Sequence, residues 1–361
     1  MGLEIKLSDS QIPPSKDFLD FLFRFSSGKD FKETWYDQLS EKLKPGSQNA
    51  VEERLKQHAN QSLTDPVVQQ ALMQSYNYTI AILLGEIEKL RQTIQKFKFI
   101  YVIGCPRSGG SYLTKQIYLS LGMKPGTVPG LLAHDGFPKA WPFYIGNKHN
   151  QHTDMTRYIA EYLIMIELFF KDRPLHEDKI IIPKKDLNAA YHGAFFNQIL
   201  GPDAEYIITV RHPVSSCIST YEKSGGLPDN NKFVTRSTIE NFAMRDNIFT
   251  GANKKDIYDQ DYFDVYLRYW EQYHMNLALT GLCAQRQHKT VGYSSSSMMS
   301  AAEEFHTRFG NNSSAEKFKT FDKKNRHPQW LKKAEKAVYR VNNTWQQLGL
   351  EFPLDEVMEI W

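Results

Sequence analysis

Residues 99–111 read Phe-Ile-Tyr-Val-Ile-Gly-Cys-Pro-Arg-Ser-Gly-Gly-Ser, and this stretch decides the fold of the chain. Its first five residues are β-branched or aromatic, which is typical of a buried parallel strand. Residues 104–110 then form a glycine-containing turn, and residues 111–121 carry apolar side chains at every fourth position, as one face of a helix does. A strand, a glycine turn and a helix in this order predict the opening unit of a nucleotide-binding α/β fold.

Three more segments, at residues 179–182, 206–210 and 289–293, have the composition of strands. Helix-like segments separate them, notably residues 155–170 and 261–282. Because alternating strands and helices build parallel sheets that are covered on both faces, we expect an α/β protein, specifically a three-layer P-loop-like fold with a mainly parallel central sheet.

Residues 1–97 have a different character, because apolar side chains recur there at helical spacing and no catalytic motif is present. We therefore expect an all-helical N-terminal region at residues 1–97, followed by an α/β domain at residues 98–361. Three roles are compatible with the N-terminal region: a helical cap, an arm that joins copies of the chain into a homo-oligomer, and a gate for the substrate.

Composition narrows the class of protein. The 361 residues are 41% hydrophobic and 13% aromatic, which is ample for a packed core. The formal net charge is only +3, so we expect no nucleic-acid partner, and any anion site must be local. No apolar run approaches the roughly 18 residues that span a bilayer. Three cysteines without metal-binding spacing, and a start without an apolar leader, predict a reduced cytoplasmic protein.

The turn at residues 104–111 has the composition of an anion site. Glycines let backbone N–H groups crowd around an oxyanion, and the start of the following helix adds partial positive charge. Arg107 supplies a full charge, while Ser108 and Ser111 supply hydroxyl groups. A Walker A loop needs lysine where Gly110 stands, so hydrolysis of ATP or GTP with magnesium is poorly supported.

An early arginine followed by hydroxyl residues resembles the 5′-phosphosulfate loop of sulfotransferases that use PAPS (3′-phosphoadenosine-5′-phosphosulfate). The usual form of that loop is P-[KR]-S-G-[TS]-[TS], followed by an aromatic or aliphatic residue. Residues 105–112 carry the resemblance and depart from the usual form at Gly110. The resemblance implies that six residues surround the 5′-phosphosulfate of the donor, namely Arg107, Ser108, Gly109, Gly110, Ser111 and Tyr112.

A second motif lies about 100 residues further along the chain. Residues 206–221 form a predicted strand that ends at Arg211, then a helix in which Ser219 stands eight residues after the arginine. This arrangement resembles the family's 3′-phosphate motif, R-[ND]-P-x-x-x-x-x-S-x-Y, and implies that Arg211 and Ser219 bind the 3′-phosphate of the donor. Ligands of α/β folds bind at the carboxyl ends of strands, which is where Arg211 stands. His212 replaces the usual Asn or Asp and is assigned no role.

Two softer matches lie towards the end of the chain. Tyr293 ends a predicted strand where the family places a tyrosine near the adenine, and the resemblance implies that contact, with core packing as the alternative. Residues 317–326 form a basic loop, and in the family a late basic loop closes over the 3′-phosphate. Lys323, Lys324 or Arg326 would make that contact here, with a solvated charged face as the alternative.

Sulfuryl transfer needs a base that takes the acceptor's proton, and cations where charge develops. Arg107 is the first candidate cation. The second is Lys184 or Lys185, because family members often place a lysine just after the strand predicted at residues 179–182. Four residues are candidates for the base, namely Asp186, His134, Asp135 and, more weakly, His192. His134 is preferred, because the unperturbed pKa of histidine, about 6.5, suits a base at neutral pH.

The resulting hypothesis is an enzyme that transfers a sulfuryl group from PAPS to a hydroxyl or amine of a small molecule or carbohydrate. It would release PAP (3′,5′-adenosine bisphosphate) and need no metal. Four aromatic residues line the acceptor pocket or pack in the core in this hypothesis: Phe137, Trp141, Phe143 and Tyr144. Two alternatives stay open, a P-loop kinase or nucleotide hydrolase without the Walker lysine and a non-catalytic scaffold that binds PAP.

Overall fold

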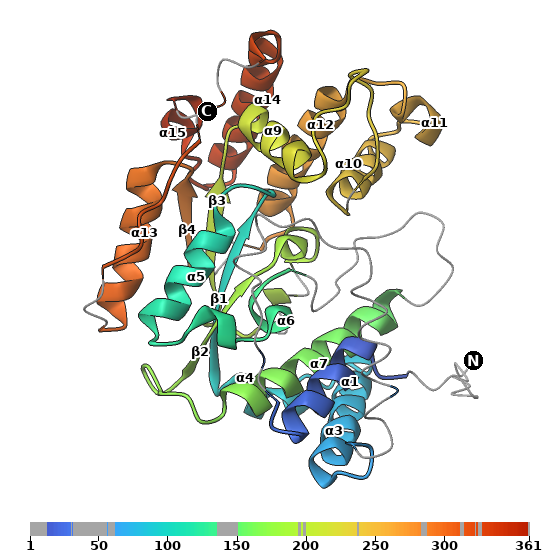
Figure 1. Cartoon of the computed structure of the whole chain (residues 1–361), viewed down its shortest axis with the longest axis vertical. Helices are drawn as coiled ribbons and strands as arrows, with labels where there is room; N and C mark the ends of the chain where they lie inside the picture. The colour runs from blue at the N-terminus through green and yellow to red at the C-terminus, as the bar shows by residue number, and fades with distance from the viewer. Residues whose placement is uncertain are drawn as a thin grey trace.

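A four-stranded, all-parallel sheet forms the centre of the computed structural model (Figure 1). The strands are β1 (Phe97–Gly104), β2 (Ile180–Lys185), β3 (Glu205–Val210) and β4 (Gln287–Gly292), and they lie in the order β2-β1-β3-β4. The structure describes residues 13–29, 31, 56, 62–135, 151–193, 196–197, 200–236, 238–282, 287–310, 314–321, 323 and 327–359. The predicted α/β class and parallel sheet are confirmed.

Helices cover both faces of this sheet. On one face, Ile100 and Val102 of β1 pack with α5 (Gly110–Ser120) and α13 (Ser295–Arg308). On the other face, Phe99 and Tyr101 belong to the larger core cluster, which includes side chains of α7 (Gln151–Phe170) and α12 (Tyr262–Leu279). Alternate residues of β1 are thus buried against different helices, which explains why its sequence is apolar almost throughout.

Strand β2 extends beyond the predicted segment 179–182. Its ladder with β1 pairs Tyr101 with Lys184 and Val102 with Lys185, and the N–H of Asp186 donates to the Val102 carbonyl (3.1 Å). Polar lysines continue the strand because the backbone pairing with β1 continues. Both lysines therefore have fixed positions at the carboxyl edge of the sheet.

Every regular element that the structure describes before β1 is a helix. These elements are α1 (Lys16–Ser26), α3 (Pro66–Leu83) and α4 (Glu88–Ile94), and α1 and α3 pack against α7 (Figure 1). Ser15 joins α1 to α7, because its N–H (2.7 Å) and its hydroxyl (2.6 Å) donate to the two carboxylate oxygens of Glu161. The N-terminal helices thus rest on a helix that also covers the sheet.

The remaining elements follow the strands and complete the layers. They are η1 (Pro125–Thr127), α6 (Gly130–Ala133), η2 (Leu187–Tyr191), α9 (Pro213–Lys223), α10 (Thr238–Phe249), α11 (Lys254–Ile257), α14 (Pro328–Gln347) and α15 (Leu354–Glu359). None of the described helices combines the length and the apolar composition that crossing a membrane requires.

Candidate functional site

The turn between β1 and α5 is shaped by close backbone contacts. A Cβ atom on Gly104 would lie 2.6 Å from the backbone oxygen of Thr209 in β3, so glycine is required there. Arg107 has a φ of 68°, and Gly109, the N-cap of α5, has a φ of 93°. Two residues in the left-handed region therefore turn the chain from the strand into the helix.

Ser108 supports the turn from within. Its hydroxyl donates to the Cys105 carbonyl (2.6 Å) and lies 2.7 Å from the Thr209 hydroxyl. Its single proton is thus used inside the protein. An anion at this turn meets the backbone N–H groups and Arg107 rather than the Ser108 hydroxyl.

Arg107 and Arg211 come from separate motifs and lie together at the carboxyl ends of β1 and β3. An Arg211 Nη1 hydrogen donates to the Arg107 carbonyl (3.0 Å), and Arg107 Nε donates to the Ser219 hydroxyl (3.1 Å). The Arg211 guanidinium carbon lies 4.0 Å from the centre of the Tyr293 ring. Four of the residues singled out in the sequence therefore form one cluster.

Among the described residues no carboxylate forms an ion pair with either arginine of this cluster, although the charge of Glu222 raises the pKa of both. Arg211 is 3% exposed, its Nε has no hydrogen-bond partner, and neither Arg107 nor Arg211 forms an ion pair with any described residue. Burial lowers the pKa of both guanidinium groups, and the charge of Arg107 lowers that of Arg211 further. Two neighbouring cations that are costly to bury are stabilised by an anion, so the cluster suits an anionic ligand.

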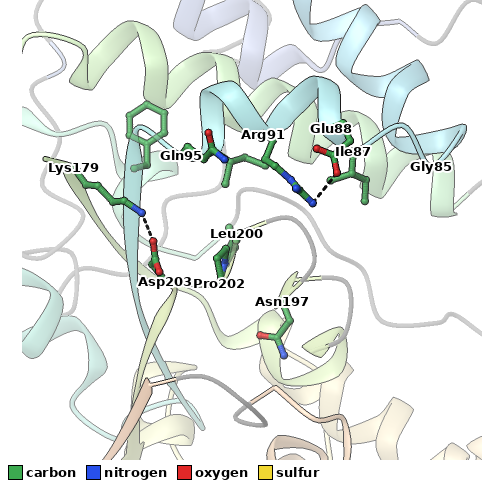
Figure 2. A pocket seen from close by; sticks show the side chains of 13 residues that line it. Gly85, Ile87, Glu88, Arg91, Gln95, Lys179, Asn197, Leu200, Pro202 and Asp203 are labelled. Carbon is green, nitrogen blue, oxygen red and sulfur yellow. Dashed lines mark hydrogen bonds and ion pairs between the residues drawn. The ribbon is translucent and has the colours of Figure 1, made fainter.

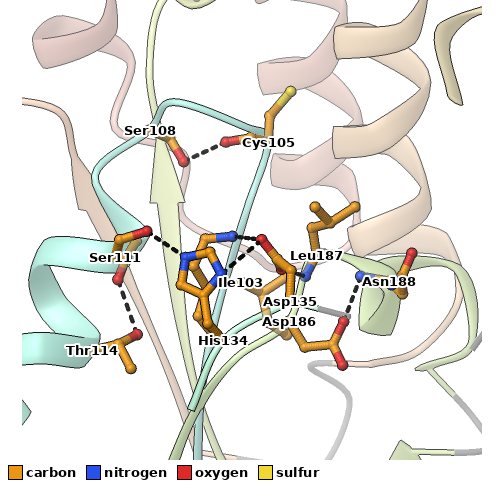
Figure 3. Close-up of polar contacts among 12 residues, drawn as sticks. Ile103, Cys105, Ser108, Ser111, Thr114, His134, Asp135, Asp186, Leu187 and Asn188 are labelled. Atoms are coloured by element: carbon orange, nitrogen blue, oxygen red, sulfur yellow. Dashed lines mark hydrogen bonds and ion pairs between the residues drawn. The ribbon is translucent and has the colours of Figure 1, made fainter. Parts of the chain in front are cut away.

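His134, which follows α6, contacts the start of α5. Its Nε2 lies 2.7 Å from the Ser111 hydroxyl oxygen, and its Nδ1 lies 3.5 Å from Oδ2 of Asp135 (Figure 3). Lys185 pairs with the same oxygen of Asp135, whose other oxygen accepts the N–H of Leu187 (3.1 Å). A chain of polar contacts therefore runs from the turn at residues 104–111, named the anion turn below, through His134 to the end of β2.

Electrostatics set the protonation states in this chain. Burial and the charge of Lys185 lower the pKa of His134 to about 3, so its ring is neutral at neutral pH. Burial would raise the pKa of Asp135, but Lys185 and His134 bring it to about 2. The ionised Asp135 only accepts hydrogen bonds, which favours the tautomer with the proton on Nδ1 and leaves Nε2 as an acceptor. Nε2 accepts the Ser111 hydroxyl in this tautomer, and a neutral histidine can act as a base there once an acceptor hydroxyl takes the place of Ser111.

The neutral state of His134 makes folding stability depend on pH. Between pH 3 and 6.5 the unfolded chain binds a proton that the folded protein does not, so this contribution is complete above pH 6.5 and is lost as the pH falls. When the pH falls from 7 to 5, we expect the free energy of unfolding to decrease by about 2 kcal/mol because of His134. Urea titrations at both pH values should show that this decrease in the free energy of unfolding is smaller in His134→Gln than in the wild type. Equal decreases in the two proteins would contradict a neutral His134 ring in the folded protein.

The two lysines of β2 lie on opposite faces of the sheet, because side chains alternate along a strand. Lys184 donates to the carbonyls of Leu131 (2.6 Å) and His134 (2.5 Å), so it supports the segment that carries His134. Lys185 faces α5, where a Cβ atom on Gly110 would lie 3.3 Å from the lysine Cε. Of the two lysines that the sequence left open, Lys185 is the cation beside the anion turn.

Asp186 shares the face of Lys184, away from the anion turn. It is fully buried, and its carboxylate accepts the N–H of Asn188 (2.8 Å) and thereby caps η2. Burial raises the pKa of Asp186 to about 7, although Lys184 opposes the shift. His192, the weaker candidate, is the C-cap of η2. Among the candidate bases, His134 is the one that contacts the turn directly.

The late loop, described at residues 314–321 and 323, packs over the turn. Phe318 lies against Tyr112 (ring centres 4.7 Å apart) and against Tyr293 (5.1 Å). The Tyr112 hydroxyl donates to the Glu316 carbonyl (2.6 Å). An aromatic cluster therefore borders the two arginines.

The late loop also contacts the arginine cluster. The Phe321 carbonyl accepts from Arg211 Nη2 (3.4 Å), and Lys323 pairs with Glu222 of α9. The other predicted residues of this region and of the acceptor pocket lie outside the described residues: Lys324, Arg326, Phe137, Trp141, Phe143 and Tyr144.

Lys223 is a basic residue near the site that neither motif includes. It is exposed and lies on the last turn of α9, four residues after Ser219, so the two share a helix face. Partial burial and the charges of Arg107 and Lys185 lower its pKa. Helical spacing from Ser219 was the sequence pattern that could have identified it.

A cavity of about 890 Å³ lies at the opposite edge of the sheet, where the strands begin (Figure 2). Its walls come from α4, the start of β1 and residues 200–203. Its charged side chains are paired, Arg91 with Glu88 (2.7 Å) and Lys179 with Asp203. Because these pairs are neutral overall, the cavity lacks the unbalanced positive charge of the cluster at the carboxyl edge.

No three His, Cys, Asp or Glu side chains in the described ranges gather closely enough to hold a metal ion. Comparisons of the chain with protein-family models, curated proteins and solved structures found no match. The functional assignment therefore rests on the residues of the chain itself.

Proposed function

We propose that this protein is a PAPS-dependent sulfotransferase. The observation that supports the proposal most is the contact between Arg107 and Arg211 at the ends of neighbouring strands, with Ser219 bonded to Arg107. Two adjacent arginines without carboxylate partners among the described residues suit a ligand with two separate anionic groups. PAPS is such a ligand, because it carries a 5′-phosphosulfate and a 3′-phosphate on one ribose.

In this proposal each end of the donor has its own binding groups. The 5′-phosphosulfate lies against Arg107 and the N–H groups at the start of α5, where the helix dipole favours negative charge. Arg211 binds the 3′-phosphate through its guanidinium group, whose buried Nε has no hydrogen-bond partner among the described residues. The adenine lies beside the aromatic cluster of Tyr293 and Phe318.

The reaction needs one proton transfer and one displacement at sulfur. The acceptor oxygen bonds to sulfur while the bond between sulfur and the bridging phosphate oxygen breaks and PAP leaves. His134 takes the acceptor's proton at Nε2, and Asp135 stabilises the charged ring. Arg107 balances the charge that develops on the bridging oxygen. A negative donor also offsets the charges of nearby lysines, so its binding raises the pKa of His134.

Ligand binding separates this proposal from the alternatives. In a thermal-shift titration we expect strong stabilisation by PAP and little by 5′-AMP, because Arg211 distinguishes the two by the 3′-phosphate. A preference for ATP with magnesium would favour a kinase or nucleotide hydrolase, although Gly110 stands where the Walker lysine is needed. PAP binding without turnover of PAPS on a broad acceptor panel would favour a scaffold.

Arg211→Ala tests the same contact directly. A lost hydrogen bond to a charged group costs about 1.5–3 kcal/mol, so PAP should bind roughly tenfold more weakly or worse. Calorimetric titration measures the loss, with Arg340→Ala as the matched control, since Arg340 pairs with Glu271 on an exposed surface. Arg211→Lys, which keeps the charge, should lose less affinity. Unchanged PAP binding in Arg211→Ala would remove the main support for the proposal.

A further inference from the structure

One face of α9 follows the anion turn along its length. The Ser216 hydroxyl donates to the Pro106 carbonyl (2.8 Å), and one turn later Ser219 accepts from Arg107 Nε (3.1 Å). Residues three and four apart share a helix face, so Lys223 is the next residue on the face of α9 that carries Ser216 and Ser219; we call this row of residues the α9 stripe. The α9 stripe thus runs past Arg107 and ends at a second cation, Lys223.

The last turn of α9 carries two neighbouring residues of opposite charge, Glu222 and Lys223, and they interact with different groups of the site. Glu222 pairs with Lys323 of the late loop and acts on the charges of both Arg211 and Arg107. Lys223 acts instead on His134, and the charges that act on Lys223 are those of Arg107, Lys185 and Asp135. Lys223 therefore belongs to the His134 side of Arg107, away from the end where the 3′-phosphate would lie.

Lys223 is also available to a ligand. It is exposed and forms no ion pair within the part of the chain that the structure describes. Its nearby carboxylate, Asp135, is already paired with Lys185. Three cations, Arg107, Lys185 and Lys223, thus lie around the region between the anion turn and His134, and the carboxylates that act on them, Asp135 and Glu222, are paired with Lys185 and Lys323.

The sulfuryl group of the donor must occupy this region, because the acceptor oxygen has to reach sulfur while its proton reaches His134. We propose that Lys223 donates a hydrogen bond to a sulfuryl oxygen of PAPS, a contact that PAP cannot make because it lacks the sulfuryl group. This inference rests on the proposed function. It makes Lys223 a residue that distinguishes the donor from the product.

The test compares two ligands on two variants. We expect Lys223→Gln to bind PAPS about tenfold more weakly than the wild type and PAP about as tightly, as measured by calorimetric titration without acceptor. Lys223→Arg, which keeps the charge, should retain most of the PAPS affinity. Lys232→Gln is the matched control, because Lys232 is an exposed lysine that pairs with Asp259.

The outcomes are distinct. A selective loss of PAPS affinity in Lys223→Gln supports the contact with the sulfuryl group. Equal losses for PAPS and PAP would place Lys223 on the 5′-phosphate and overturn the inference, and so would unchanged affinities for both. A wild-type protein that binds neither nucleotide would instead overturn the proposed function, and the inference with it.

Discussion

Substituting glutamine for His134 is expected to lower the turnover number about a hundred- to ten-thousand-fold, the usual contribution of a positioned general base. Glutamine keeps a polar group near the Ser111 hydroxyl but cannot take the acceptor's proton. Affinity for PAP should change little, because the phosphates are held by the arginines and the helix start. The measurement is the steady-state rate with labelled PAPS and the most active acceptor from a panel of phenols, alcohols, amines and oligosaccharides.

Asp186→Asn is the matched test of Asp186, another of the four candidate bases. Asp186 is fully buried on the far face of β2, and asparagine retains an oxygen for the N–H of Asn188. Burial already favours its neutral form, so we expect turnover within about tenfold of the wild type, far above that of His134→Gln. Loss of turnover in Asp186→Asn, with near-normal turnover in His134→Gln, would transfer the role of base to Asp186.

Alanine at Gly104 is expected to lower the free energy of unfolding by about 3 kcal/mol or more, or to prevent folding. The added Cβ would lie 2.1 Å from the Thr209 hydroxyl oxygen and 2.6 Å from both the Ser108 hydroxyl oxygen and the Thr209 backbone oxygen. The backbone of Thr209 belongs to β3, which pairs with strands on both sides, so it cannot move away cheaply. Urea denaturation followed by circular dichroism measures the loss.

Two further variants isolate the cause of this loss. Gly122→Ala differs from Gly104→Ala in placing alanine at a positive φ, 70°, in open space, so it carries backbone strain without a clash and we expect a loss of about 1 kcal/mol. Adding Thr209→Ala to Gly104→Ala should not restore stability, because the backbone oxygen of residue 209 remains. A loss in Gly104→Ala no larger than that in Gly122→Ala would show that the turn can move away from β3.

The sequence by itself determined the local units of this protein. The strand, the glycine turn and the helix at residues 97–120 follow from local composition, and so do β3 and the helix after it. Within these units, Arg107 stands at a turn and Arg211 stands at a strand end because covalent order and helical or strand periodicity place them there. Local sequence was therefore sufficient to predict these elements and the positions of the two arginines within them.

Only the tertiary structure decided which side chains meet. Alternation along β2 predicts that Lys184 and Lys185 point to opposite faces, but the packing of α5 selects Lys185 as the cation beside the turn. The same packing separates Asp186 from the turn and joins His134 to Ser111. The contact between Arg107 and Arg211 likewise needs β1 and β3 to be neighbours in the sheet. These choices depend on which elements pack together across long stretches of chain, and local sequence patterns carry no information about that packing.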